Sequence, residues 1–202
     1  MIYVAILWRG DNVLLSVTDE FKRIRRLRHD DVPYLMEWDN DPELFELTGK
    51  KFSLDDNNDD WWASLVRDRT RLVFAIVDDL GQLIGDVELL QIVWRAREAE
   101  VRISIGDKQY WNHGYGTEAL RETLGAAFQM LSLKRVYLRV RSDNERAIHS
   151  YRKAGFRRVA RLAATGRLRG CAELQLMEMT RTRYSLGPDR ALRPASVLTP
   201  RS

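Results

Sequence analysis

A glycine-containing turn between a strand pattern and a helix pattern is the feature that most constrains the fold of this chain. Residues 110–120 read YWNHGYGTEAL and follow the alternating segment 99–105, which has the period of a half-buried strand. Apolar residues then recur at helical spacing over 119–131, so a helix is predicted to begin near Gly116 and to run towards Leu133. The chain must therefore carry a strand, a tight turn and a helix in immediate succession.

The start of this helix has the properties of an anion-binding site. The first N–H groups of a helix have no partner within it, and the helix dipole adds partial positive charge there. Gly114 and Gly116 have no side chains, so the backbone amides can approach a phosphate closely. Taken alone, the pattern is equally compatible with a plain tight turn in which the glycines only supply positive φ angles.

A second motif follows the helix and favours the anion-binding interpretation over the plain turn. Residues 135–140 alternate like another strand, and residues 143–156 read DNERAIHSYRKAGF, in which an Asx residue caps a short helix that Gly155 ends. The motifs W-x-x-G-Y-G-T-E-A-L and D-N-x-x-A-x-x-x-Y-x-K-x-G-F, in this order, resemble the GCN5-related N-acetyltransferase superfamily. The resemblance covers about residues 22–181 and is nearest to the ribosomal-protein N-acetyltransferase-like branch.

The resemblance implies both a fold and a reaction. The fold is α/β, with a mixed, largely antiparallel, twisted sheet flanked by helices, and the cofactor enters where two central strands splay. The reaction is the acetyl-CoA-dependent transfer of an acetyl group to a primary amine, by direct attack in a ternary complex. The superfamily's pyrophosphate loop usually begins with Gln or Arg, whereas Trp111 stands at that place here, a departure familiar in the branch named above.

The resemblance also implies a set of cofactor-binding residues. Backbone amides of residues 112–117 bind the pyrophosphate, and the polar backbone edges of two isoleucines pair with the pantetheine arm as an added strand would. The Asn144 amide bonds the pantetheine, and the Tyr151 hydroxyl lies near the thioester sulfur. The implied cofactor site comprises Ile103, Ile105, Trp111, Asn112, His113, Gly114, Tyr115, Gly116, Thr117, Asn144 and Tyr151.

Two residues are candidates for catalysis. An amine must be neutral to attack a thioester, and the departing thiolate leaves more easily beside a proton donor. Tyr151 is the candidate donor, since a free phenol has a pKa of about 10 and a free thiol one of about 8.5; its alternative role is core packing in a helical stripe. Glu100 is the candidate base, usually acting through water in related enzymes, or it is a solvated strand residue opposite Arg102 or Arg139.

Composition limits the remaining classes of protein. A chain of 202 residues with 45% hydrophobic content can build one sizeable core. Cys171 is the single cysteine and the three histidines are dispersed, so neither a disulfide framework nor a metal site is expected. The chain has no apolar run of membrane-spanning length and residues 1–8 lack a basic leader, which together favour the cytoplasm.

The organisation predicted along the chain has three parts. Residues 1–20 form a hairpin extension, residues 21–184 the acetyltransferase-like domain, and residues 185–202 an extended or disordered tail. Within the domain, residues 39–60 read as a loop-rich acidic segment that precedes a helix with Trp61 and Trp62. Its aspartates either attract a cationic acceptor or belong to a solvated loop with a helix cap; they are Asp55, Asp56, Asp59 and Asp60.

The expected partners are acetyl-CoA and an amine acceptor, either a small amine or a protein N-terminus, and a homodimer is plausible. The net charge of +4 and the arginine clusters at 23–28 and 157–161 leave open a ribosome- or RNA-associated binder, although alternation with apolar residues makes nucleic acid the less favoured partner. The other alternative is a non-catalytic CoA-sensing or interaction protein that keeps the phosphate loop.

Overall fold

The computed structural model describes residues 21–51, 57–163 and 173–187 of the chain. The predicted hairpin at 1–20 and nearly all of the tail lie outside the described residues, as do Asp55, Asp56 and Cys171. The three-part division of the chain therefore stays a prediction. Among the helices of the described residues, none combines the length and the apolar character that crossing a membrane requires.

In the described residues, seven strands form one sheet in the order β1-β2-β3-β4-β5-β7-β6. β4 and β5 run parallel, whereas the other neighbouring pairs are antiparallel. The prediction of a mixed, largely antiparallel sheet is thus confirmed. The strands are β1 (Ile24–Arg26), β2 (Leu72–Val77), β3 (Leu83–Val93), β4 (Glu98–Ile105), β5 (Arg135–Arg141), β6 (Arg157–Ala163) and β7 (Glu173–Thr180).

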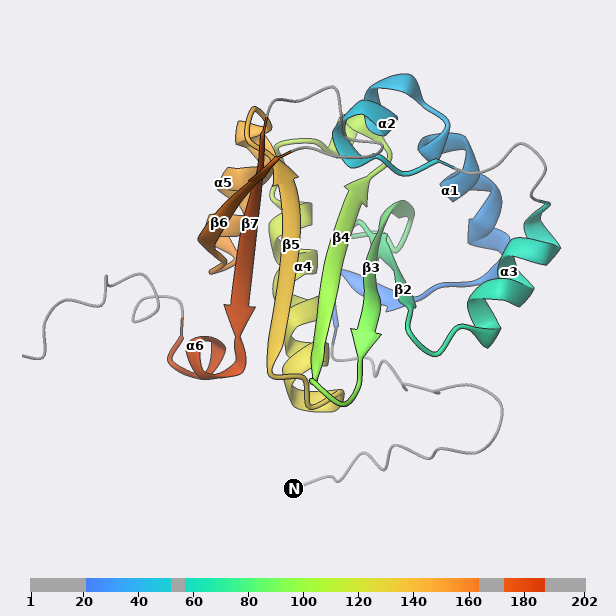
Figure 1. The fold of residues 1–202 in the computed structure, drawn as a ribbon. Helices are drawn as coiled ribbons and strands as arrows, with labels where there is room; N and C mark the ends of the chain where they lie inside the picture. Colours follow the sequence, from blue (N-terminus) through green and yellow to red (C-terminus); the bar gives the residue numbers. More distant parts are fainter. Residues whose placement is uncertain (1–20, 52–56, 164–172, 188–202) are drawn as a thin grey trace, which may run out of the picture.

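Helices flank the sheet on both faces. Figure 1 shows α4 and α5 behind the sheet, α1 and α3 beside its β2–β3 side, and α2 at the end of β4. The described helices are α1 (Val32–Asp39), α2 (Pro42–Thr48), α3 (Asn58–Arg67), α4 (Tyr115–Gly125), α5 (Glu145–Lys153) and α6 (Arg181–Ser185). The helix predicted to run from Gly116 towards Leu133 is α4 followed by a π-helical segment, Ala126–Met130.

The main core lies between the sheet and the helices behind it. Alternate residues of β3 point into it, including the fully buried Val87 and Leu89, and they pack with Leu120, Leu124 and Phe128 on the α4 side. A smaller cluster on the opposite face joins Leu27, Leu35 and Ala75 to Trp61 and Trp62, which confirms that these tryptophans contribute to the core. Burial of these apolar side chains is the main force that holds both helical layers on the sheet.

The parallel pair at the centre of the sheet is short. β4 and β5 pair only over Glu98–Glu100 and Arg135–Tyr137, although both strands continue beyond these residues. β5 is then paired with β7 alone, along its whole length, and β4 with β3. The two strands therefore splay beyond Glu100, as the family resemblance predicted, and they leave backbone polar groups available between them.

One prediction about local structure was wrong. The segment 39–60 was expected to be rich in loops, yet it contains α2, whose N-cap Asp41 accepts hydrogen bonds from the backbone of Glu43 and Leu44. The strand predicted at 172–181 is confirmed as β7, which ends at Thr180, and the Thr180 side chain caps the short helix α6, which was not predicted. In both places an N-cap residue begins a helix of seven residues or fewer, too short to show a clear apolar period.

Candidate active site

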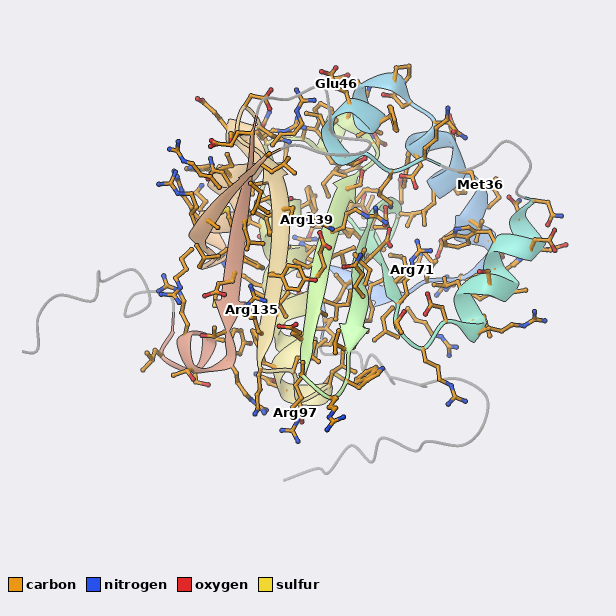
Figure 2. All side chains as sticks on the ribbon, viewed as in Figure 1. Met36, Glu46, Arg71, Arg97, Arg135 and Arg139 are labelled. Carbon is orange, nitrogen blue, oxygen red and sulfur yellow. The ribbon has the colours of Figure 1, made fainter. Side chains whose placement is uncertain are left out.

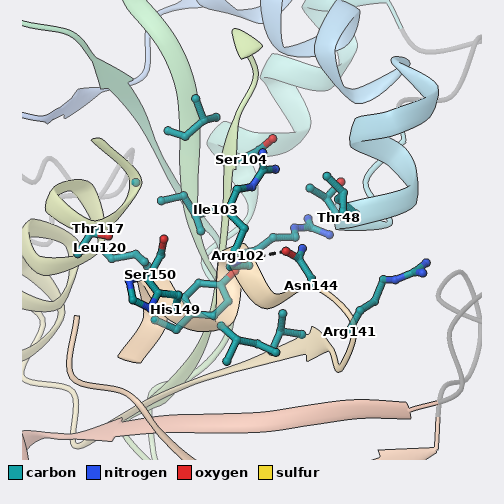
Figure 3. A pocket seen from close by; sticks show the side chains of 18 of the residues that line it. Thr48, Arg102, Ile103, Ser104, Thr117, Leu120, Arg141, Asn144, His149 and Ser150 are labelled. Carbon is teal, nitrogen blue, oxygen red and sulfur yellow. Dashed lines mark hydrogen bonds between the residues drawn. The ribbon is translucent and has the colours of Figure 1, made fainter. Parts of the chain in front are cut away.

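A cavity of about 1110 Å³ opens where β4 and β5 splay. It is bordered by β4, the loop before α4, the end of β5, α5 and the C-terminal end of α2. Of the twelve predicted site residues, His113 and Tyr115 do not line it and the other ten do. Figure 3 shows side chains from all these directions around the cavity, among them Thr48, Arg102, Ile103, Thr117 and Asn144.

The loop before α4 has the conformation that an anion-binding turn requires. Asn112 and Gly114 have φ angles of 66° and 92°, in the left-handed region, and Gly114 is the N-cap of α4. A Cβ atom at Gly114 would meet no protein atom within 4 Å, and one at Gly116 would be 3.7 Å from the Ile105 side chain. The loop therefore leaves open space in front of the first amides of α4, which have no partners within the helix.

Side chains of the loop turn away from this space and fix its position. The Trp111 indole donates a hydrogen bond to the carbonyl of Ile105 (2.8 Å). The Arg146 guanidinium stacks over the indole, with its Cζ atom 3.6 Å from the ring centroid. Tyr115 packs edge-on against Tyr110, and its hydroxyl donates to Asp79 (3.3 Å). His113 is exposed. Trp111 thus ties the loop to the end of β4, a structural contact that its place in the motif did not predict.

α5 presents two polar groups to the cavity. The Asn144 side-chain oxygen accepts a hydrogen bond from the backbone of Ala147 (3.1 Å), which caps the helix and leaves the amide NH₂ available. Tyr151 is half-buried, packs against Phe156 with ring centroids 6.1 Å apart, and its hydroxyl has no hydrogen-bond partner among the described residues. Burial raises the pKa of Tyr151 to about 12, so the phenol stays protonated at any physiological pH.

Glu100 lies at the apex of the splay. Its side chain is 9% exposed and accepts two hydrogen bonds from Arg139, Nε to Oε1 at 2.9 Å and Nη2 to Oε2 at 2.7 Å. The second reading of Glu100 is thus right about the partner, Arg139, and wrong about solvation, because the side chain is buried. The carboxylate also lines the cavity, which leaves its chemical role as a base a prediction.

The sequence did not predict a buried ionic cluster beside the cavity. Lys50, directly after α2, contacts Asp86 (2.7 Å), Glu88 (2.9 Å) and Asp39 (3.5 Å), and all four side chains are at most 7% exposed. Glu88 also contacts Arg102, whose side chain lines the cavity. Burial raises the pKa of Asp86 to about 6 despite Lys50, whereas the cations around Glu88 hold its pKa well below the usual range.

The acidic residues of α3 do not join this site. Asp59 is exposed and pairs with His29 (2.9 Å), and Asp60 accepts a hydrogen bond from Asn57, the N-cap of α3. Neither lines the cavity. In this part of the segment the reading as a solvated turn with a helix cap is the one that describes the geometry. α2 contributes cavity-lining residues instead, and its Asp-Pro-Glu start was the signal that would have found it.

Comparison with known proteins identifies the class. Residues 23–157 match the family described as "Acetyltransferase (GNAT) domain". A spermidine N(1)-acetyltransferase of Escherichia coli (strain K12) is 32% identical over 138 residues, which are 66% of this chain and 72% of the relative. A spermidine N(1)-acetyltransferase of Vibrio cholerae is 27% identical over 137 residues, 66% of this chain and 77% of that relative.

Solved structures show the same fold. A crystal structure of spermidine N-acetyltransferase from Vibrio cholerae in complex with CoA and spermine has a TM-score of 0.69 and 23% identity, covering 80% of this chain and 96% of that chain. A chimera of the Vibrio cholerae enzyme and hSSAT has a TM-score of 0.70 at 22% identity, with coverages of 80% and 96%.

The chain belongs to the GNAT acetyltransferase family. It is an N-acetyltransferase that takes its acetyl group from acetyl-CoA and passes it to a primary amine. The expected superfamily is confirmed, whereas the relatives are spermidine acetyltransferases and do not specifically support the ribosomal-protein branch.

Proposed function

We propose that the acetyl acceptor of this enzyme is a polyamine of the spermidine class. The observation that carries the proposal is the 32% identity to a spermidine N(1)-acetyltransferase over 138 residues. The relatives favour a polyamine over the protein N-terminus that the narrower resemblance suggested. We further propose that the chain self-associates, because the proteins with a similar fold include a dodecameric spermidine N-acetyltransferase from Vibrio cholerae.

The charge and geometry of the cavity support a proposal for how CoA binds. Six cationic side chains line the cavity, and its carboxylates are Glu100 and the exposed Glu145. This excess of positive charge suits the phosphates of CoA. In the proposed complex the amides of residues 112–117 bind the pyrophosphate, the backbone of Ile103 and Ile105 pairs with pantetheine, and the Asn144 amide donates to the pantetheine arm. The cationic residues are Arg102, Arg139, Arg141, Arg146, Arg152 and Lys153.

The proposed reaction needs one nucleophilic attack, one proton transfer and one hydrogen bond to the leaving sulfur. The neutral amine nitrogen bonds to the thioester carbon, the C–S bond of the tetrahedral intermediate breaks, and the sulfur leaves as the CoA thiolate. Glu100 accepts the amine proton, through water, at the apex of the splay. Tyr151 keeps its proton because burial raises its pKa to about 12, so its hydroxyl donates a hydrogen bond to the developing thiolate.

The test is calorimetric titration with acetyl-CoA, followed by thiol release on the same protein across a panel of amines. The panel contains spermidine, spermine, a monoamine, an aminoglycoside and a peptide with a free N-terminus. We expect acetyl-CoA to bind and spermidine or spermine to give the highest kcat/KM. A higher kcat/KM for the peptide would overturn the polyamine proposal and return the enzyme to the ribosomal-protein branch. Acetyl-CoA binding without thiol release from any amine would instead support the non-catalytic alternative.

A further inference from the structure

The carboxylate at the apex of the cavity already holds a cation from the protein itself. Both oxygens of Glu100 accept hydrogen bonds from Arg139, at 2.9 and 2.7 Å, in the parallel two-bond geometry that arginine forms best with a carboxylate. Arg139 comes from β5, beyond the residues that pair with β4, and it lines the same cavity. The guanidinium therefore stands where the carboxylate would meet an incoming ammonium group.

The two partners differ in their access to water. The Glu100 side chain is 9% exposed, whereas the Arg139 side chain is 44% exposed. Figure 2 shows Arg139 on the face of the sheet over β4 and β5, which no helix covers there. Arg139 has no other carboxylate partner among the described residues. The Arg139 side chain can thus move into solvent at a small cost in free energy, because it is already partly hydrated. The buried Glu100 carboxylate then needs another cation in its place.

The Arg139 guanidinium and an acceptor ammonium compete for the Glu100 carboxylate. With Arg139 in place, each carboxylate oxygen accepts a hydrogen bond from the guanidinium, and a second positive charge beside the guanidinium is repelled. Because of this repulsion, binding of an acceptor ammonium to Glu100 competes with the Arg139 ion pair. The exchange keeps the buried carboxylate neutralised, since one positive charge replaces another.

We propose that Arg139 is a specificity-determining residue that occupies the acceptor position of Glu100 until a cationic amine displaces it. The proposal rests on the proposed function, in which the acceptor is a polyamine. Displacement of the Arg139 ion pair costs every acceptor the same, whereas the guanidinium that remains nearby repels an acceptor with several positive charges more than a monoamine. Arg139 thereby moderates the preference of Glu100 for highly charged acceptors.

The experiment compares the wild-type enzyme with Arg139→Met and with a matched control, Arg135→Met. Arg135 lies four residues earlier on β5, pairs with Glu98 (3.1 Å) and Glu178 (2.8 Å), and does not line the cavity. Both variants remove one positive charge from the same strand, so a general change in surface potential affects them alike. The measurements are KM and kcat for spermidine and for a monoamine, and the calorimetric Kd of spermidine for the enzyme–CoA complex.

The proposal predicts that Arg139→Met lowers the KM and the Kd for spermidine about fivefold, and widens the preference for spermidine over the monoamine, while Arg135→Met does neither. Equal changes in both variants would mean bulk electrostatics and would overturn it. A lower kcat with an unchanged or higher KM would also overturn it, since Arg139 would then only orient Glu100.

Failure of the underlying function is a separate outcome. If the wild type binds acetyl-CoA but acetylates no amine while Arg139→Met acetylates spermidine, the competition is supported in its strongest form. If neither protein acetylates any amine, both the proposed acceptor and the role of Arg139 are wrong. If the wild type prefers the peptide, the polyamine proposal fails, and the role of Arg139 fails with it unless the same KM decrease appears for the peptide.

Discussion

At the scale of single residues, Tyr151 combines a free hydroxyl with an environment that keeps it protonated. The ring packs into the core beside Phe156, the hydroxyl has no partner among the described residues, and burial raises the pKa to about 12. The packing role that the sequence offered as an alternative is therefore confirmed, and the role of Tyr151 as a donor stays a prediction with which the free, protonated hydroxyl is compatible. These two roles are separable, because phenylalanine keeps the packing and removes only the O–H group.

We expect Tyr151→Phe to lower kcat about 100-fold, at the low end of what a positioned donor contributes, with little change in acetyl-CoA affinity. Steady-state thiol release and calorimetric titration measure the two quantities on one preparation. A variant that binds acetyl-CoA normally and turns over at the wild-type rate would remove Tyr151 from the mechanism. Burial places the phenol pKa near 12, so Tyr151 does not titrate below pH 10. Below pH 10 the pH–rate profile should therefore have the same shape in the variant as in the wild type.

At the scale of elements, the cluster around Lys50 joins α1, the residue after α2, and β3. It holds the end of α2 against the sheet, and through Glu88 it contacts Arg102 of the cavity wall. The folded protein raises the pKa of Asp86 to about 6, above the usual value of an aspartate, because burial disfavours its charge. The folded state therefore holds a proton between about pH 4 and 6 that the unfolded chain has released, so the contribution of Asp86 to stability falls as pH rises through this window.

Asp86→Asn should remove this dependence. We expect the difference in unfolding free energy, wild type minus Asp86→Asn, to decrease by about 2 kcal/mol between pH 4 and 7. Glu88 and Lys50 do not change this window, because the pKa of Glu88 is lowered and that of Lys50 is raised away from it. Urea unfolding at several pH values measures the difference, with Asp59→Asn as a control whose side chain is 87% exposed. A constant difference across the window would contradict the raised pKa.

At the scale of the whole molecule, cofactor binding should be visible as stability. A ligand that binds only the folded state, at 100 times its Kd, adds about 2.7 kcal/mol to the free energy of unfolding. For a protein of this size that corresponds to an increase in Tm of roughly 5–10 °C. We expect this shift with acetyl-CoA and with CoA, and a much smaller one in Gly114→Val at the same concentrations.

The valine acts in two ways at this position. Gly114 has a φ of 92°, which a β-branched residue adopts only with strain, and its Cβ would enter the open space in front of the first amides of α4. The strain lowers the Tm of the free variant, so the readout is the ligand-induced shift and not the Tm itself. Differential scanning fluorimetry with and without acetyl-CoA separates the two; an undiminished shift would refute the phosphate-binding role of the loop.

Local pattern and tertiary structure determined different parts of this protein. The strand, the glycine turn and the helices of both motifs were predictable from the sequence, since periodicity, caps and glycines report backbone geometry within a few residues. α2 was missed because its seven residues carry too little periodicity, although its Asp-Pro start was visible. Neighbours across the sheet were only partly predictable. Arg139 was one of the two predicted partners of Glu100, and the structure selects it over Arg102. Lys50 and Asp86 are 36 residues apart, and no sequence pattern predicted that folding brings them together.

The same limit applies to the burial of polar residues on β3. Asp86 and Glu88 alternate with apolar residues along β3, which is typical of a strand with one face in water, yet both are buried. Alternation shows that two faces of a strand differ and does not show what covers the polar one. The sequence by itself determined the family, the cofactor loop and the residues of α5. The tertiary structure decided which charges meet, because ion pairs between distant residues depend on how the helices and strands pack and not on the order of residues within them.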